Sequence, residues 1–138
     1  AHIAFDFLGY TFRPRTSKNR WGKLFISFTP AISNKAAKAI RQKSRDWNWR
    51  LQSGSDLEAL AMKYNPVIQG WLNYYGHFYP SALIPTLYCL EDRLVKWAMR
   101  KYKHLRGHRR RAAQWLKGIA QKEPELLAHW RLIYATAG

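Results

Sequence analysis

The sequence predicts a mainly α-helical fold, a helical bundle with a short β-hairpin at its N-terminus. From residue 33 onward, apolar residues recur at spacings of three and four, which is the period of an α-helix. Before residue 30, short runs rich in Phe, Ile and Tyr have the composition of strands. The 138 residues include seven Trp, eight Tyr and six Phe, so the chain can bury a substantial core and is not a disordered basic tail.

The hairpin is expected to consist of two strands, over residues 3–12 and 23–29, joined by a long basic loop over residues 13–22. This loop segment, RPRTSKNRWG, contains a Pro, a Gly, small polar residues and four cations, a composition typical of loops. Pro30 is expected to end the hairpin. The chain therefore divides into a hairpin over residues 1–30 and a helical region over residues 31–138.

The helical region opens with a helix that runs to about residue 47, with Ser33 as its N-cap. The stripe of this helix that is expected to pack consists of Ala36, Ile40, Ser44 and Trp47. Ser55 and Glu58 form a capping box, which predicts the start of a second helix. The apolar stripe of this helix continues to residue 78, so we expect Pro66 to kink or restart it. Because Gly70 and Gly76 weaken a helix relative to Ala, their presence suggests that another backbone or helix lies close by.

A long third helix is predicted from Pro80 to about Leu105, with apolar residues on one side and cations on the other. Gly107 is suited to end it. Two shorter helices are expected over residues 108–120 and 124–134. The sequence contains no internal repeat of fixed period.

The charge balance points to a polyanionic partner. Twenty-four Lys and Arg against eight Asp and Glu give a formal net charge of +16, and so much positive charge in a short chain repels itself unless an anion lies beside it. Nucleic acid is the leading partner, ahead of a membrane surface or an acidic protein. No apolar run reaches the roughly 18 residues of a membrane span. Cys89 is the single cysteine, which suits a reducing cytosol.

No catalytic or metal-binding residue set is expected. Glu91 and Asp92 are adjacent, and neighbouring residues on a helix point about 100° apart, so we expect them to pair with nearby cations rather than share a metal ion. His104 and His108 have the spacing of a helical metal pair, but Gly107 is expected to break the helix between them, and the surrounding cations disfavour a metal.

The nucleic-acid prediction depends on three cationic segments, over residues 13–23, 35–45 and 96–111. Cations that neutralise phosphates gain binding affinity because counterions are released. For any single cation, a solvated surface position remains an equal alternative. Trp71 and Tyr75 fit the apolar stripe and are expected in the core, whereas Asn73 and Tyr74 point elsewhere and could contact unpaired bases. The candidate RNA-binding residues are Arg13, Arg15, Lys18, Arg20, Lys35, Lys38, Arg41, Arg45, Asn73, Tyr74, Arg93, Lys96, Arg100, Lys101, Lys103, His104, Arg109, Arg110 and Arg111.

The chain resembles the C-terminal part of bacterial group II intron reverse transcriptase/maturases from about Phe5 to Trp130. The resemblance is carried by FDFLGYTF, FTPAISNKAAKAIRQKSR, NPVIQGWLNYYGHFYPSAL, WAMRKYKHLRGHRRRAAQWL and PELLAHWR, and NPVIQGWLNYYG is its most specific part. It implies that the hairpin is the end of the last reverse-transcriptase block and grips the primer end. The primer-grip-like residues would be Phe7, Leu8, Gly9 and Tyr10. The helices would form the thumb and the maturase-specific X region.

The resemblance also implies a division of labour. The catalytic fingers and palm, with their Tyr-Ala-Asp-Asp motif, would precede Ala1, so this chain is not expected to be an enzyme on its own. The parent protein would be an RNA-directed DNA polymerase that uses Mg²⁺, and no cofactor is expected in this part. The implied partners are group II intron RNA, template-primer nucleic acid and the parent fingers and palm, in the bacterial cytoplasm. A membrane partner is not expected, and a homodimer is left open.

Two alternatives stay open at this point. The chain could be only the thumb of a polymerase, with no separate role in splicing, or it could be a basic structural module that assembles on acidic protein. The resemblance further implies that Phe5, Phe7 and Leu8 lean on the palm. The hairpin should then be the least ordered part of the chain unless the helices cover these three residues.

Overall fold

The fold is that of a computed structural model, which describes residues 5–7, 9–18, 24–77 and 80–134; for residues 5–7, 12–18, 24–30 and 50 it describes the backbone alone. The helices and strands, in chain order, are β1 Phe5–Phe7, β2 Tyr10–Lys18, β3 Leu24–Ile32, α1 Asn34–Asp46, η1 Trp49–Leu51, α2 Leu57–Tyr75, η2 Pro80–Leu83, α3 Ile84–Lys101, η3 Lys103–Leu105, α4 Arg109–Lys122 and α5 Trp130–Tyr134. The η elements are short 3-10 helices.

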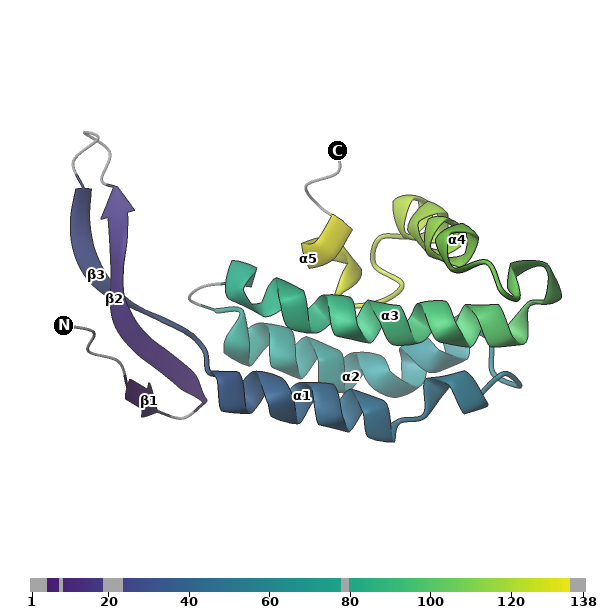
Figure 1. Cartoon of the computed structure of the whole chain (residues 1–138), viewed down its shortest axis with the longest axis horizontal. Helices are drawn as coiled ribbons and strands as arrows, with labels where there is room; N and C mark the ends of the chain where they lie inside the picture. Colours follow the sequence, from purple (N-terminus) through teal and green to yellow (C-terminus); the bar gives the residue numbers. More distant parts are fainter. Residues whose placement is uncertain (1–4, 8, 19–23, 78–79, 135–138) are drawn as a thin grey trace.

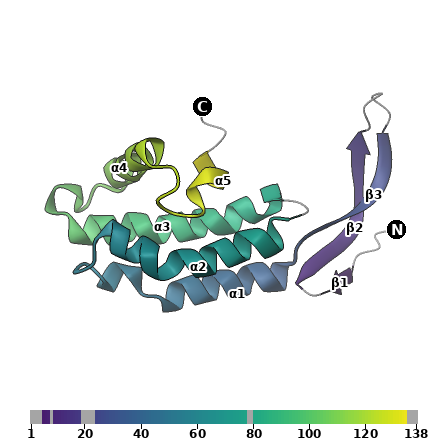
Figure 2. The same cartoon turned by 180° about the vertical axis from the view of Figure 1, so that it is seen from behind.

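The helices form a bundle with the sheet at one end (Figure 1). Helices α1, α2 and α3 run side by side, and α4 and α5 both lie on the same side of α3, as the view from behind also shows (Figure 2). Strand β3 leads almost directly into α1. The predicted fold class, mainly α-helical with an N-terminal β-hairpin, is confirmed.

The hairpin differs in detail from the prediction. The single strand expected over residues 3–12 is two strands, because the chain reverses at Gly9 and Phe7 pairs with Tyr10. Much of the expected basic loop is also strand. Residues 13–18 belong to β2 and pair with β3, from Arg13 opposite Thr29 to Lys18 opposite Leu24. Loop-like composition is overridden here by backbone pairing with β3.

Two prolines lie inside these strands, although prolines were expected only in the loop and at the end of the hairpin. Pro30 lies in β3, which is an edge strand of the three-stranded sheet. Because β3 has no neighbouring strand on its other side, the missing N–H of Pro30 disrupts no second set of interstrand hydrogen bonds. Pro14 lies in β2 beyond Phe12, where β1 has ended and β2 is paired on one side only. Strand β3 continues to Ile32, past residue 30; the division into two regions stays a prediction.

The starts of α1 and α2 agree with the sequence to within one residue. Ser33 caps α1 as predicted, because its Oγ accepts a backbone N–H at 3.1 Å. Asp56, not Ser55, caps α2, with its carboxylate accepting a backbone N–H at 2.7 Å. Helix α2 runs through Pro66 as one element. The carbonyl that this proline leaves unbonded belongs to Met62, whose residue is 82% exposed, so water can reach that side of the helix.

Two of the later helices are shorter than predicted, whereas α4 covers the helix expected over residues 108–120 except for its first residue. The helix expected from Pro80 to Leu105 is α3 flanked by η2 and η3, and Gly107 follows with a φ of 76°. The last predicted helix, over residues 124–134, is helical only in α5. Its apolar residues are nevertheless buried: Leu127 and Trp130 are 0% and 1% exposed. Burial of these side chains therefore does not require a continuous helix.

The core lies around α3, whose predicted apolar stripe is buried. Helix α3 packs against α1, η1, α4 and α5. Its buried apolar side chains are Leu87, Leu90, Leu94, Val95, Trp97 and Ala98. Because each fully buried side chain of this size contributes roughly 1.5–3 kcal/mol, this stripe is the main reason that the elements around α3 hold together.

An aromatic cluster fixes the segment that follows α1. Trp47 stacks on Tyr64 and Trp71 of α2, with ring centroids 4.3 and 5.3 Å apart, and on Trp49, at 5.5 Å. Trp71 is half-buried against the core, as predicted. Trp49 is 1% exposed. The C-terminal end of α1 and the whole of η1 are thereby held in place, and with them the polar side chains that face α3.

Two glycines allow a test of the packing between sheet and bundle. Gly9 has a φ of 86°, and a Cβ there would lie 2.9 Å from a ring carbon of Tyr75. Gly70 has open space around it, so the close backbone expected there is absent, whereas a Cβ at Gly76 would lie 2.6 Å from the carbonyl oxygen of Leu72 in α2. We expect Gly9→Ala to destabilise the fold by about 1–3 kcal/mol and Gly70→Ala, in mid-helix, to stabilise it by about 0.5–1 kcal/mol. Urea denaturation of both variants measures the difference, and shifts of the same sign would contradict this packing.

Candidate nucleic-acid interface

Arg93 is fixed at the seam between α1 and α3. Its Nε–H donates to Ser44 Oγ at 3.2 Å, and the Ser44 hydroxyl donates in turn to the carbonyl of Arg41 at 2.8 Å. Ser44 is only 2% exposed, so this small chain of hydrogen bonds is shielded from water. Burial, together with the charge of nearby Arg45, lowers the pKa of the Arg93 guanidinium. Arg93 is therefore a cation held in one position rather than a freely moving surface side chain.

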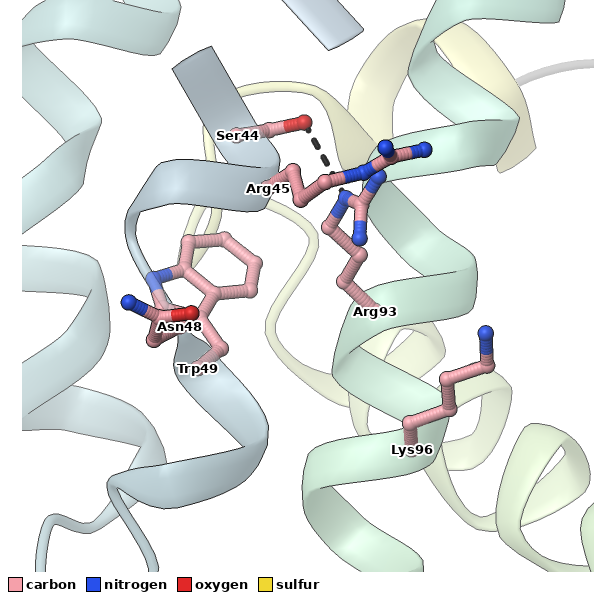
Figure 3. A pocket seen from close by; sticks show the side chains of 6 residues that line it. All are labelled: Ser44, Arg45, Asn48, Trp49, Arg93 and Lys96. Carbon is pink, nitrogen blue, oxygen red and sulfur yellow. Dashed lines mark hydrogen bonds between the residues drawn. The ribbon is translucent and has the colours of Figure 1, made fainter. Parts of the chain in front are cut away.

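A cavity of about 240 Å³ opens beside this arginine. The guanidinium groups of Arg45 and Arg93 gather at one end of it, close to Ser44, while Lys96 lies farther along α3 (Figure 3). Its lining residues are Ser44, Arg45, Asn48, Trp49, Arg93 and Lys96. No lining residue is acidic. The cavity is therefore a concave, strongly positive site.

The positive surface continues along α3 to the start of α4. Two shallower hollows, of about 510 and 370 Å³, adjoin the cavity, and Lys96 lines all three. We call the cations that line these hollows the basic groove; they are Arg45, Arg93, Lys96, Arg100, Arg106 and Arg109. They come from α1, α3, the turn after η3 and α4, so the groove exists only in the folded chain.

Asp92 is the one acidic residue that lines these three hollows in the described part of the chain. Its carboxylate pairs with Lys96 at 3.4 Å and with Arg109. The predicted pairing of Asp92 with nearby cations is thus confirmed. Because the side chains of these partners are more than half or about half exposed, each pair contributes little stability. Asp92 instead holds the start of α4 beside α3 and leaves the groove with an excess of positive charge.

Glu91 has a different role from the one predicted, because its partners are neutral donors and a histidine rather than Lys or Arg. It is 6% exposed, and its carboxylate accepts from His129 Nε2 at 2.8 Å and from Trp130 Nε1 at 2.9 Å. The Tyr134 hydroxyl donates to its other oxygen. Burial alone would raise the pKa of Glu91, but hydrogen bonding and charge attraction with His129, and the bonds from Tyr134 and Trp130, hold that pKa below its ordinary value. Burial and the Glu91 carboxylate raise the pKa of Tyr134.

Five of the predicted RNA-binding residues meet in the basic groove, namely Arg45, Arg93, Lys96, Arg100 and Arg109. Lys101, also predicted, is instead used inside the fold: its Nζ donates to the Ser53 carbonyl at 2.8 Å and lies over the Trp97 ring. Six further cations lie outside the groove, all exposed except the half-buried Arg41; they are Lys35, Lys38, Arg41, Lys103, Arg110 and Arg111. His104 is exposed as well.

The hairpin candidates are less fully described. Arg13, Arg15 and Lys18 lie in β2, where the structure describes the backbone alone, and Arg20 lies outside the described residues. Of the predicted primer-grip-like set, Phe7 is described by its backbone in β1, Leu8 lies outside the described residues, and Gly9 and Tyr10 are described in full. Whether the helices cover Phe5, Phe7 and Leu8, the condition on which the expected order of the hairpin depends, also falls outside the described side chains.

The aromatic candidates lie where the sheet meets α2. Tyr10 is 8% exposed, and its ring lies 5.2 Å from that of Tyr74 and 5.9 Å from that of Tyr75. Tyr74 retains 45% of its surface, so one side of it is open to solvent. Asn73 is exposed, and its side-chain oxygen accepts from Gln69 at 2.9 Å. This corner is separate from the basic groove.

Three polar or charged residues that line the cavity or the groove are absent from the predicted set. Ser44 was assigned to the apolar stripe of the first helix, and its polar function appears only because α3 brings Arg93 to it. Asn48 follows α1 with a φ of 52°, a backbone conformation that Asn tolerates better than most residues. Arg106 lies in the cationic run before Gly107 and could have been included by its position alone.

Gly107, with its φ of 76°, separates His104 from His108, and no cluster of three or more His, Cys, Asp or Glu suited to a metal ion occurs among the described residues. Within the described part of the chain, no helix is both long enough and apolar enough to cross a lipid bilayer.

A family model described as group II intron, maturase-specific domain matches residues 37–115. No curated protein and no solved structure matches the chain. The matched segment covers more than half of the chain, from α1 into α4, and every cation of the basic groove lies inside it. By this match the chain belongs to the family of the group II intron maturase-specific domain, the C-terminal X region of group II intron reverse transcriptases.

Proposed function

We propose that the chain binds folded group II intron RNA through the basic groove and thereby promotes splicing. One observation carries the proposal: the groove is assembled from four separate segments of the chain, and all of its cations lie within the maturase-specific match. A folded RNA presents phosphates in a fixed three-dimensional array. Cations that are held in a fixed array of their own can select that shape without reading individual bases.

The binding step follows from charge. Each phosphate that a groove cation neutralises releases condensed counterions, so affinity falls steeply as salt is added. The intron must be held in its active fold for splicing, and a ligand that binds the folded form alone stabilises it by mass action. The chain supplies no bond chemistry in this proposal: the maturase-specific domain lacks the catalytic fingers and palm.

A second role is proposed for the parent protein, in which the same region helps to hold template-primer for a Mg²⁺-dependent polymerase in the bacterial cytoplasm. The alternative is a polymerase thumb with no part in splicing. The family match favours the splicing role, because the matched domain is the maturase-specific one. A basic module that assembles on acidic protein predicts tight binding to the fingers and palm and negligible affinity for RNA.

Splicing of the cognate intron by the full parent protein tests the proposal. We expect substitution of Lys96 and Arg100 by Ala to slow splicing and to weaken binding of the chain to intron RNA, with a steep salt dependence of that binding in the unsubstituted chain. Loss of complementary DNA synthesis with normal splicing would favour the polymerase thumb. Affinity that hardly changes with salt would contradict binding by phosphate contacts.

A further inference from the structure

The cavity in Figure 3 brings two guanidinium groups together without an acidic partner in its lining. Arg45 comes from the last turn of α1 and Arg93 from the middle of α3, and the interaction between their charges is strong enough to contribute to the lowered pKa of Arg93. Two like charges side by side are unfavourable by themselves. An anion placed between them would turn this repulsion into attraction.

Arg93 is prepared for such an anion. Its Nε–H is taken by Ser44, a neutral acceptor, which fixes the plane of the guanidinium and leaves its two terminal nitrogens for another acceptor. An arginine fork held in one orientation binds a planar or tetrahedral oxyanion through two parallel hydrogen bonds and loses little side-chain entropy in doing so. A lysine at this position would supply positive charge but not the two parallel N–H donors of a guanidinium.

We propose that this cavity docks one phosphodiester of the bound RNA between the guanidinium groups of Arg45 and Arg93. The proposal rests on the proposed function and adds a particular docking point to it. RNA is favoured over an acidic protein because the cavity opens into the basic groove, where Lys96, Arg100 and Arg106 continue the positive charge along α3. A polyanion with evenly spaced charges can pair with each cation along α3, whereas a single carboxylate can pair only with the cations of the cavity.

The first test compares single substitutions at equal salt. Arg45 is exposed, so Arg45→Gln removes one charge without disturbing the core, and Lys117→Gln removes one charge from the exposed side of α4, outside the groove. We expect Arg45→Gln to weaken binding to intron RNA by about tenfold or more, and Lys117→Gln by less than about threefold. Arg93→Lys keeps the charge but loses the fork, and is also expected to cost about tenfold. Melting temperatures near that of the unsubstituted chain confirm folding.

Equal effects of Arg45→Gln and Lys117→Gln, with Arg93→Lys unchanged, would overturn the docking point in favour of a diffuse basic surface. A second measurement is independent of RNA affinity. The Nε–H resonance of Arg93 is followed by NMR as inorganic phosphate, and separately an intron RNA fragment, is added. We expect both to shift it. A shift with inorganic phosphate alone would identify a site for free phosphate and overturn the RNA assignment, and no shift with either would overturn the pocket.

These outcomes separate the two levels of the proposal. If the chain fails to bind intron RNA, the proposed function fails, while the phosphate titration of Arg93 still decides whether the cavity binds an oxyanion. If the chain binds intron RNA with a steep salt dependence but Arg45→Gln behaves like Lys117→Gln, the proposed function stands and the docking point is wrong.

Discussion

Replacement of Lys96, Arg100 and Arg106 by Gln is expected to lower the affinity for intron RNA by roughly two to three orders of magnitude at about 0.1 M salt. Each phosphate contact contributes about 0.9 to the slope of log affinity against log salt, so at this salt concentration each contact is worth nearly one order of magnitude. The slope itself should fall by about 3. Titrations at several salt concentrations measure both quantities.

A matched control removes the same charge elsewhere. Lys63, Lys117 and Lys122 are exposed and do not line the groove, so their replacement by Gln changes the net charge equally. We expect this control to lower affinity by less than about tenfold, through the long-range field alone. If both triple variants lose affinity to the same extent, the net charge of the chain would explain binding and the groove would not.

Substitution of Glu91 should be the most damaging single change to the fold. Glu91→Gln replaces a carboxylate that accepts hydrogen bonds from His129, Trp130 and Tyr134 with an amide whose NH₂ group must face some of these donors. Breaking a buried, fully hydrogen-bonded charge costs about 3–5 kcal/mol. For a domain of this size we expect a fall in melting temperature of roughly 10 °C or more. Helix α5, which these bonds hold to α3, should open first.

Glu125→Gln is the matched control, because Glu125 also pairs with a residue of α5, Arg131, but both side chains are about 70% exposed. An exposed pair of this kind is worth about 0–1 kcal/mol, so the melting temperature should hardly move. Comparable losses in the two variants would contradict the assignment of Glu91 as the buried anchor of α5.

The acid dependence of stability follows from the same residue. The pKa of Glu91 is lower in the fold than its ordinary value of 4.5, so its contribution is complete above that value and is lost as the pH falls through the lower pKa of the folded state. The difference in unfolding free energy between the unsubstituted chain and Glu91→Gln should therefore be constant near neutral pH and shrink below about pH 4.5.

The helices could be predicted from the sequence because their apolar periodicity and their capping residues are set by nearby residues. The Ser33 cap follows from its residue type at the start of a helical pattern. The apolar stripe of α3 and the membership of Trp71 in the core follow from spacing of three and four. The hairpin was harder to predict because its structure depends on how the strands pair with one another. The turn at Gly9 and the continuation of β2 through Pro14 are decided by which backbone groups of β3 and β1 lie opposite them, and composition does not record this.

The sequence predicted the cations of the candidate site but not which of them lie together in the folded chain. The sequence identified Arg45, Arg93 and Lys96 by their helical spacing, yet it did not bring α1 against α3, so Ser44 stayed an apolar-stripe residue. Lys101 illustrates the opposite error, because it was predicted to bind RNA but has a structural role. Its neighbours in the sequence are cationic, but the Ser53 carbonyl, in the loop between η1 and α2, accepts a hydrogen bond from its Nζ and gives it a structural role. Such assignments require long-range contacts.

The most direct test of RNA binding through the basic groove is photochemical crosslinking of the chain to group II intron RNA, followed by identification of the crosslinked peptides by mass spectrometry. Binding through the groove predicts crosslinks in the two stretches that line the cavity, residues 44–49 and 93–96, and in the segment from Arg100 to Arg109. It also predicts their loss when Lys96, Arg100 and Arg106 are replaced by Gln. Crosslinks confined to the outer face of α2, around Met62 and Val67, would contradict it.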